Sequence, residues 1–159
     1  MPLLMKHTGP LWGIWKIEEP SEVLLALLQN RKEYLPQLEL IRTEQRRREW
    51  LASRVLLQEL TGGSALIAYH PNGAPYLSGS SLHISISHTK GYAAVLLQDH
   101  PAAGIDIEYR SERVSRIRSR FMNPEEEAGI DKEYETEHLL LHWCAKETLF
   151  KMVGYEEVD

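Results

Sequence analysis

The 159-residue chain contains a single cysteine, Cys144, so it cannot form an internal disulfide. This sparing use of cysteine is typical of the reducing cytoplasm, which is where we expect the protein to reside. No apolar run approaches the length of a membrane span, and the opening residues Met1–Lys6 lack the layout of a signal peptide. We therefore expect no membrane partner.

The chain also lacks an excess of positive charge, because 18 Lys and Arg residues stand against 23 Asp and Glu residues. A nucleic-acid-binding protein normally presents a broad basic face, so we expect no nucleic-acid partner. The acidic excess is concentrated in residues 101–159, whereas the first hundred residues are nearly balanced. Internal repeats and low-complexity tracts are absent as well.

Hydrophobic periodicity predicts a mixed succession of strands and helices. Leucines at helical spacing follow Ser21, and Pro36 separates this first helix from a longer one that Gly62 would end. Near the other end, Asn123 and Pro124 precede three glutamates, which is typical of a helix start. The expected strands are residues 11–17, 65–70, 74–77, 82–87, 92–97 and 104–109, and the expected long helices are residues 37–61 and 136–153, the last ended by Gly154.

Two acidic residues stand inside the apolar stretch Gly104–Glu108. If this stretch is a strand, Asp106 and Glu108 lie on one face, roughly 6.5 Å apart along the backbone. Carboxylates this close repel one another unless a cation lies between them, and a hard divalent cation is the natural candidate. An edge strand with one solvated face would produce the same pattern, so the stretch does not decide the matter alone.

The last predicted helix carries charges in its apolar stripe. At 100° per residue, Glu147 falls about 40° from Trp143, and Lys146 and Lys151 flank the same stripe. Charges in such a position are costly unless they are paired, which favours a functional role. The alternative is a Glu147–Lys151 salt bridge at the rim of the core.

Cations also gather on the helix predicted for residues 37–61. Guanidinium groups bind phosphate through two parallel hydrogen bonds, so this helix is a candidate phosphate-binding edge. A solvated face is the alternative, because Glu44 and Glu49 are interleaved. His88 follows a predicted strand at the entry to a loop, where a side chain can reach a ligand. The five arginines are Arg42, Arg46, Arg47, Arg48 and Arg54.

Four motifs in fixed order carry a resemblance to a known family: Asn72–Pro75, Ile84–Thr89, Gly104–Glu108 and Trp143–Lys151. Together they resemble the 4′-phosphopantetheinyl transferases, and among these the longer, monomeric type that activates surfactin synthetase (Sfp type). The motifs cover about residues 70–155, and the stretch Trp50–Arg54 extends the resemblance toward the N-terminus.

The resemblance implies an α+β fold, a two-lobe pseudo-dimer with its ligands in the cleft between the lobes. We expect an N-terminal α/β lobe over residues 1–101, with the arginine-bearing helix and a hairpin, and a C-terminal lobe over residues 102–159 that carries the metal site. Because the family continues into further strands after the last motif, we expect the C-terminal lobe to be truncated and its sheet incomplete. The expected state is a monomer, with association possible through the open sheet edge.

The implied activity is that of a holo-[acyl-carrier-protein] synthase. Coenzyme A would donate its 4′-phosphopantetheine group to a serine of an acyl or peptidyl carrier protein, with Mg²⁺ as the cofactor and 3′,5′-adenosine bisphosphate as the second product. Such carriers serve fatty-acid, polyketide or nonribosomal peptide synthesis. The segment after Glu108 lies where the family docks its carrier, which makes Phe121 and Met122 candidate contacts.

The resemblance also assigns roles to individual residues. Asp106, Glu108 and Glu147 would hold the metal ion, while Glu147 and Lys151 would be catalytic, with Glu147 as the base, directly or through water. Ala74 stands where the family usually has a basic residue, which removes one coenzyme contact. The expected coenzyme contacts are His88, Lys146, Lys151, Arg48, Arg54, Gly73, Pro75 and Ser87.

Two other functions remain open from the sequence. One is a truncated, non-catalytic protein that binds coenzyme A or a carrier protein. The other is a metal-dependent phosphodiesterase built on the same carboxylates. A serine hydrolase using Ser87 and His88 is a weaker alternative, because the chain has no G-x-S-x-G motif.

Overall fold

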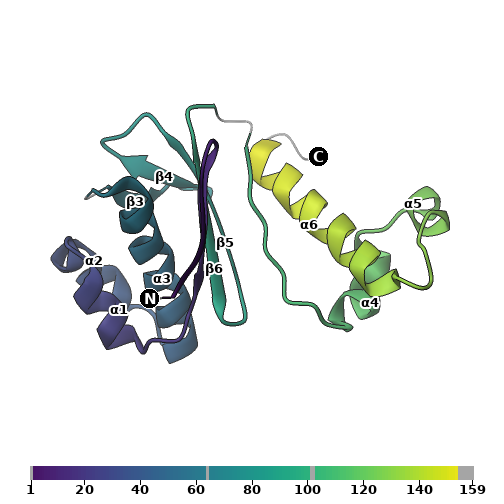
Figure 1. Ribbon diagram of the computed structural model, residues 1–159, viewed down its shortest axis with the longest axis horizontal. Coiled ribbons are helices and arrows are strands. Elements are labelled where there is room, and N and C mark those ends of the chain that lie inside the picture. The colour runs from purple at the N-terminus through teal and green to yellow at the C-terminus, as the bar shows by residue number, and fades with distance from the viewer. Residues whose placement is uncertain (1, 64, 101–102, 154–159) are drawn as a thin grey trace.

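The computed structural model describes residues 2–63, 65–100 and 103–153 and has a mixed α/β architecture (Figure 1). Its centre is a four-stranded antiparallel sheet in the order β1-β2-β6-β5, which leaves β5 at one edge. The strands are β1 (Leu3–Thr8), β2 (Leu11–Lys16), β5 (His83–Thr89) and β6 (Tyr92–Gln98).

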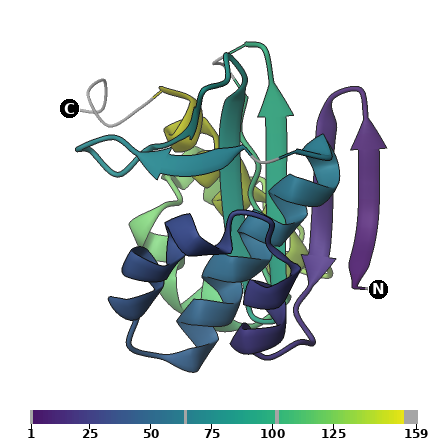
Figure 2. The ribbon, with the colours of Figure 1, turned by 90° about the vertical axis from the view of Figure 1, so that its left-hand side faces the viewer.

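Three helices cover one face of the sheet (Figures 1 and 2). They are α1 (Ser21–Leu27), α2 (Arg31–Glu39) and α3 (Glu44–Thr61). The core lies between α3 and the sheet, where Leu51, Val55 and Val95 are fully buried. A separate hairpin, β3 (Leu66–Tyr69) and β4 (Pro75–Ser78), lies beside this core.

The remaining elements lie on the opposite face of the sheet (Figures 1 and 2). An extended segment, residues 104–109, runs between the sheet and the long helix α6 (Glu135–Val153). Three short helices complete this side: α4 (Arg113–Ile117), η1 (Arg118–Arg120) and α5 (Pro124–Ala128). The sheet is therefore the middle of three layers. None of the helices in the described part of the chain is long and apolar enough to cross a membrane.

The predicted helix over residues 37–61 was wrong in its first part. Pro36 lies inside α2 instead of ending it, and the chain leaves the helix at Leu40 before α3 begins at Glu44. Thr43 caps the new helix, since its hydroxyl accepts a hydrogen bond from the Arg46 N–H at 3.3 Å. Strand β1 was not predicted at all.

The strand predicted over residues 104–109 was also wrong. The segment is extended but joins no backbone ladder, and the described residues after Gln98 contain no strand. A second lobe with its own sheet is thus not seen among them. The helix start at Asn123 was confirmed: Asn123 and Glu126 each accept the other's backbone N–H at 2.9 Å. The last helix was confirmed to within one residue at its start, while Gly154 lies outside the described residues.

Candidate functional site

A ladder of side-chain hydroxyls holds the extended segment against β5. Alternation along this strand turns Ile84 and Ile86 toward α3 and its serines toward the segment. Every second N–H of the segment donates to a β5 hydroxyl, so side chains replace the usual backbone partners. The pairs are Ile105 to Ser85 (3.0 Å), Ile107 to Ser87 (3.2 Å) and Tyr109 to Thr89 (3.2 Å).

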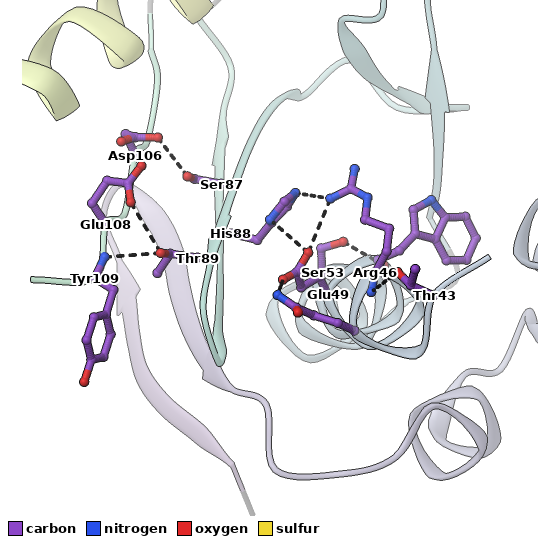
Figure 3. Close-up of polar contacts among 12 residues, drawn as sticks. Thr43, Arg46, Glu49, Ser53, Ser87, His88, Thr89, Asp106, Glu108 and Tyr109 are labelled. Carbon is purple, nitrogen blue, oxygen red and sulfur yellow. Dashed lines mark hydrogen bonds and ion pairs between the residues drawn. The ribbon is translucent and has the colours of Figure 1, made fainter. Parts of the chain in front are cut away.

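Asp106 lies in the extended segment between the sheet and α6, and side chains from both of these layers hold it. Its Oδ1 accepts a hydrogen bond from the Ser87 hydroxyl at 2.8 Å (Figure 3). The same oxygen accepts a hydrogen bond from the Lys151 ammonium, also at 2.8 Å. The side chain is only 6% exposed, and its Oδ2 is buried without a hydrogen-bond partner among the described residues. A buried carboxylate oxygen in this state is costly unless a ligand satisfies it.

Asp106, Glu108 and Glu147 line one cavity of about 260 Å³. Glu108 accepts hydrogen bonds from the Trp143 indole (3.2 Å) and the Thr89 hydroxyl (3.4 Å). Among the described residues, however, no group of three or more His, Cys, Asp or Glu side chains is gathered closely enough to hold a metal ion. The three carboxylates therefore share a cavity without forming a finished ligand cluster.

A larger cavity of about 550 Å³ adjoins the first, because Ile86, His88 and Lys151 line both. Lys151 stands at their boundary, where its ammonium also donates to the Ile105 carbonyl at 3.0 Å. Two of the predicted coenzyme contacts, Gly73 and Pro75, line the larger cavity as well. Its walls come from α3, β4, β5 and the end of α6.

Arg54 places a buried cation on the wall of the larger cavity. Arg54 is only 2% exposed, and its guanidinium stacks over the Trp50 ring, with Cζ 3.3 Å from the ring centroid. Its hydrogen-bond partners in the described ranges are neutral: the Trp50 carbonyl, the Ser53 hydroxyl and the Tyr69 hydroxyl, while its Nε has no hydrogen-bond partner there. Burial lowers the pKa of Arg54. Within the described residues no carboxylate pairs with it, so an anion in the cavity would find an uncompensated positive charge.

His88 and Arg46 add a second basic group at the cavity wall (Figure 3). The Arg46 Nη1 contacts the His88 Nε2, and the His88 Nδ1 lies 3.4 Å from the Glu49 carboxylate. Burial lowers the pKa of His88, and the Arg46 charge lowers it further, while Glu49 opposes both. His88 is therefore a neutral imidazole at neutral pH.

The structure places two of the predicted coenzyme contacts away from the cavities. Arg48 donates to the backbone carbonyls of Glu19 (2.8 Å) and Ile17 (2.9 Å) and so connects α3 to the chain after β2. Lys146 binds the Phe121 carbonyl and, at 2.7 Å, the Glu126 carboxylate of α5.

Sequence reasoning named Arg46 only as one of five arginines on its helix and gave Trp143 no role of its own, whereas the structure places both at the cavities. Arg46 and Arg48 are about 200° apart around a helix, so only the docking of α3 decides which one faces a ligand. For Trp143, its position at the start of the Trp143–Lys151 motif was the one feature of the sequence that indicated a place at the site.

Comparison with known proteins shows which proteins the chain resembles. Residues 102–157 match the family model of the 4′-phosphopantetheinyl transferase superfamily, and this range holds all three carboxylates and Lys151. The chain is also 30% identical over 115 residues to the 4′-phosphopantetheinyl transferase AcpT of Salmonella typhimurium. That alignment covers 69% of this chain and 60% of the relative, so the chain spans less than two thirds of the relative's length.

Proposed function

We propose that this protein is a phosphopantetheinyl transferase of the Sfp type, which moves the 4′-phosphopantetheine group of coenzyme A to a serine of an acyl or peptidyl carrier protein. One observation carries the proposal: a buried, half-unsatisfied Asp106 and a buried, unpaired Arg54 lie on adjoining cavities joined by His88 and Lys151. A carboxylate site beside a cation-lined cavity suits a diphosphate and its metal ion.

The chemistry of the donors suits a hard divalent cation such as Mg²⁺, although among the described residues the three carboxylates are not gathered into a ligand cluster. The donors on offer are carboxylate oxygens, and the buried Asp106 Oδ2 has no hydrogen-bond partner in the part of the chain that the structure describes. We assign Asp106, Glu108 and Glu147 as the residues that would hold the ion. A bound Mg²⁺ would neutralise the charge on the diphosphate oxygens.

The chain's own side chains then have distinct tasks. Arg54 and Arg46 bind coenzyme phosphates in the larger cavity, and Lys151 stabilises negative charge at its boundary with the smaller one. Glu147, directly or through a water molecule, takes the proton of the attacking serine hydroxyl. The serine oxygen bonds to the β-phosphorus, the bond to the nucleotide oxygen breaks, and 3′,5′-adenosine bisphosphate leaves with the electron pair.

The carrier protein would dock on the side of α4 to α6. Phe121 packs edge-to-face on Trp143, with 5.2 Å between ring centroids, and Trp143 in turn binds Glu108. This chain of contacts runs from the candidate docking residue Phe121 to the proposed metal site. A carrier serine entering from this side would arrive near Glu147.

The test is to incubate the protein with coenzyme A, Mg²⁺ and a panel of apo acyl and peptidyl carrier proteins, and to weigh the carriers by mass spectrometry. We expect at least one carrier to gain one phosphopantetheine group, and Asp106→Asn to abolish this gain. The matched control is Asp99→Asn, an exposed aspartate in the preceding loop, which should leave transfer unchanged.

No mass gain on any carrier with folded protein overturns the proposed transfer. If coenzyme A nevertheless binds, the protein is a non-catalytic binder. Cleavage of a generic phosphodiester that depends on Asp106, without any transfer, would instead indicate a metal-dependent phosphodiesterase.

A further inference from the structure

Glu49 is a buried carboxylate that the proposed reaction does not use. It lies on α3 with only 11% of its side chain exposed, and it lines neither cavity. Its Oε1 accepts a hydrogen bond from Gln45 at 3.0 Å, and its Oε2 lies 3.6 Å from Arg46 Nη1 and 3.4 Å from His88 Nδ1. Figure 3 shows the carboxylate beneath the imidazole and the guanidinium.

The two neighbours of His88 determine where its proton resides. Nε2 faces a guanidinium N–H, which can only donate, so Nε2 must be the unprotonated acceptor. Nδ1 faces a carboxylate, which can only accept, so Nδ1 must carry the proton. A neutral imidazole protonated at Nδ1 satisfies both partners at once, whereas the other tautomer satisfies neither.

We propose that Glu49 is a positioning residue: by holding the Nδ1 proton of His88 it keeps Nε2 free to orient Arg46 at the cavity wall. Three residues thus form a chain of contacts. Glu49, a buried anion on α3, contacts His88 on the edge strand β5, and His88 contacts Arg46, a half-exposed cation that faces the cavity. This inference rests on the proposed function only in naming the ligand of Arg46, a phosphate of coenzyme A.

Two readouts test the role. In the free protein, ¹⁵N NMR of the imidazole should show His88 as the Nδ1–H tautomer, and Glu49→Gln should reduce that form, which a merely structural carboxylate would not control. By calorimetry, Glu49→Gln should weaken coenzyme A binding about fivefold, the effect of losing roughly one hydrogen bond. In a His88→Ala background the same substitution should have little further effect, because the two residues act as one unit.

Glu59→Gln is the matched control, since it makes the same change at an exposed position of the same helix and should leave binding unaltered. An Nε2–H tautomer in the wild-type protein overturns the inference even if Glu49→Gln fails to fold. Unchanged affinity in a folded Glu49→Gln also overturns it, and leaves the proposed function standing. Failure of the wild-type protein to bind coenzyme A would instead count against the proposed function, while the tautomer would still decide the role of Glu49.

Discussion

At the scale of single residues, one serine controls how the acidic segment is held. Ser87 Oγ accepts the Ile107 N–H and donates to Asp106 Oδ1, and the residue is 7% exposed. It therefore satisfies a backbone donor and a carboxylate at the same time. The sequence resemblance assigned Ser87 to the coenzyme, and that role stays a prediction beside the structural one seen here.

Replacing Ser87 with alanine should lower the free energy of unfolding by about 1–3 kcal/mol, because a partly buried N–H and a carboxylate oxygen each lose a hydrogen-bond partner. Denaturant unfolding measures the change. Thr89→Val is the comparison, since it removes the exposed, solvent-accessible end of the same ladder and should cost less than half as much. Equal stability of wild-type protein and Ser87→Ala would show that the ladder does not hold the segment.

Motif spacing singled out Asp106, Glu108, Glu147 and Lys151, and all four line the smaller cavity, while the roles assigned to them stay predictions. It could not place the charges that tertiary packing captures. Lys146 flanks the same helical stripe as Glu147, yet Glu126 of a neighbouring helix binds it. The position of a residue in a helix gives the direction in which its side chain leaves the axis. It does not tell which other element of the fold packs on that side.

At the scale of elements, Gly104 permits the close approach of the acidic segment to α6. A Cβ at this position would lie 2.8 Å from the Thr148 carbonyl oxygen and 3.0 Å from Thr148 Cγ2. The contact with the backbone of α6 cannot be relieved by turning a side chain. Lys151, one turn further along, depends on this approach to reach Asp106.

Gly104→Ala should therefore push the segment away from α6, destabilising the protein by about 1–3 kcal/mol and weakening the Lys151–Asp106 pair. Thermal unfolding, together with a Mg²⁺ titration, measures both effects. Gly63→Ala serves as the control, because a Cβ there meets nothing closer than 3.8 Å. If Gly104→Ala matches the control in both measurements, the close approach is not required.

A hydrogen-bonded carboxylate also joins two helices. The Ser21 N–H and hydroxyl at the start of α1 donate to Glu44 of α3 at 2.9 and 2.8 Å. These hydrogen bonds lower the pKa of Glu44 below its ordinary value of 4.5. The ionised carboxylate thus stabilises the fold above that pH, and the contribution is lost as the pH falls through the lowered pKa.

Ser21→Ala should therefore flatten the fall in unfolding free energy as the pH drops below about 4.5, where the unfolded carboxyl takes up its proton before the folded one does. Urea unfolding at a series of pH values gives the slope. Glu22→Gln, at an exposed neighbouring position, should keep the wild-type slope. A Ser21→Ala variant with the same pH dependence as wild-type protein would contradict the role of this contact.

Periodicity predicted most elements but not how they end or pair. The alternation in Gly104–Glu108 indicates an extended chain, and it is extended; that hydroxyls of β5 replace a backbone ladder follows from the tertiary arrangement alone. Likewise, the break between α2 and α3 depends on the cap at Thr43, which a leucine pattern does not reveal.

At the scale of the whole molecule, the candidate site lies between layers. The sheet supplies His88 and the hydroxyl ladder, α3 supplies Arg46 and Arg54, and α6 supplies Glu147 and Lys151 (Figure 1). The mixed α/β class was predictable from alternating patterns. The arrangement of α6 across the sheet was not predicted, because apolar patterns do not specify which distant elements meet.

The most direct test of this shared site is the affinity of coenzyme A with and without Mg²⁺, measured by calorimetry on wild-type protein and Asp106→Asn. If the acidic cavity holds the metal ion beside the coenzyme phosphates, Mg²⁺ should tighten coenzyme A binding about tenfold or more in the wild-type protein, and each ligand should favour the other. The enhancement should vanish in Asp106→Asn. Equal affinities with and without Mg²⁺ in the wild-type protein would contradict a metal site beside the coenzyme phosphates. An undiminished enhancement in Asp106→Asn would contradict the role of Asp106 in that site.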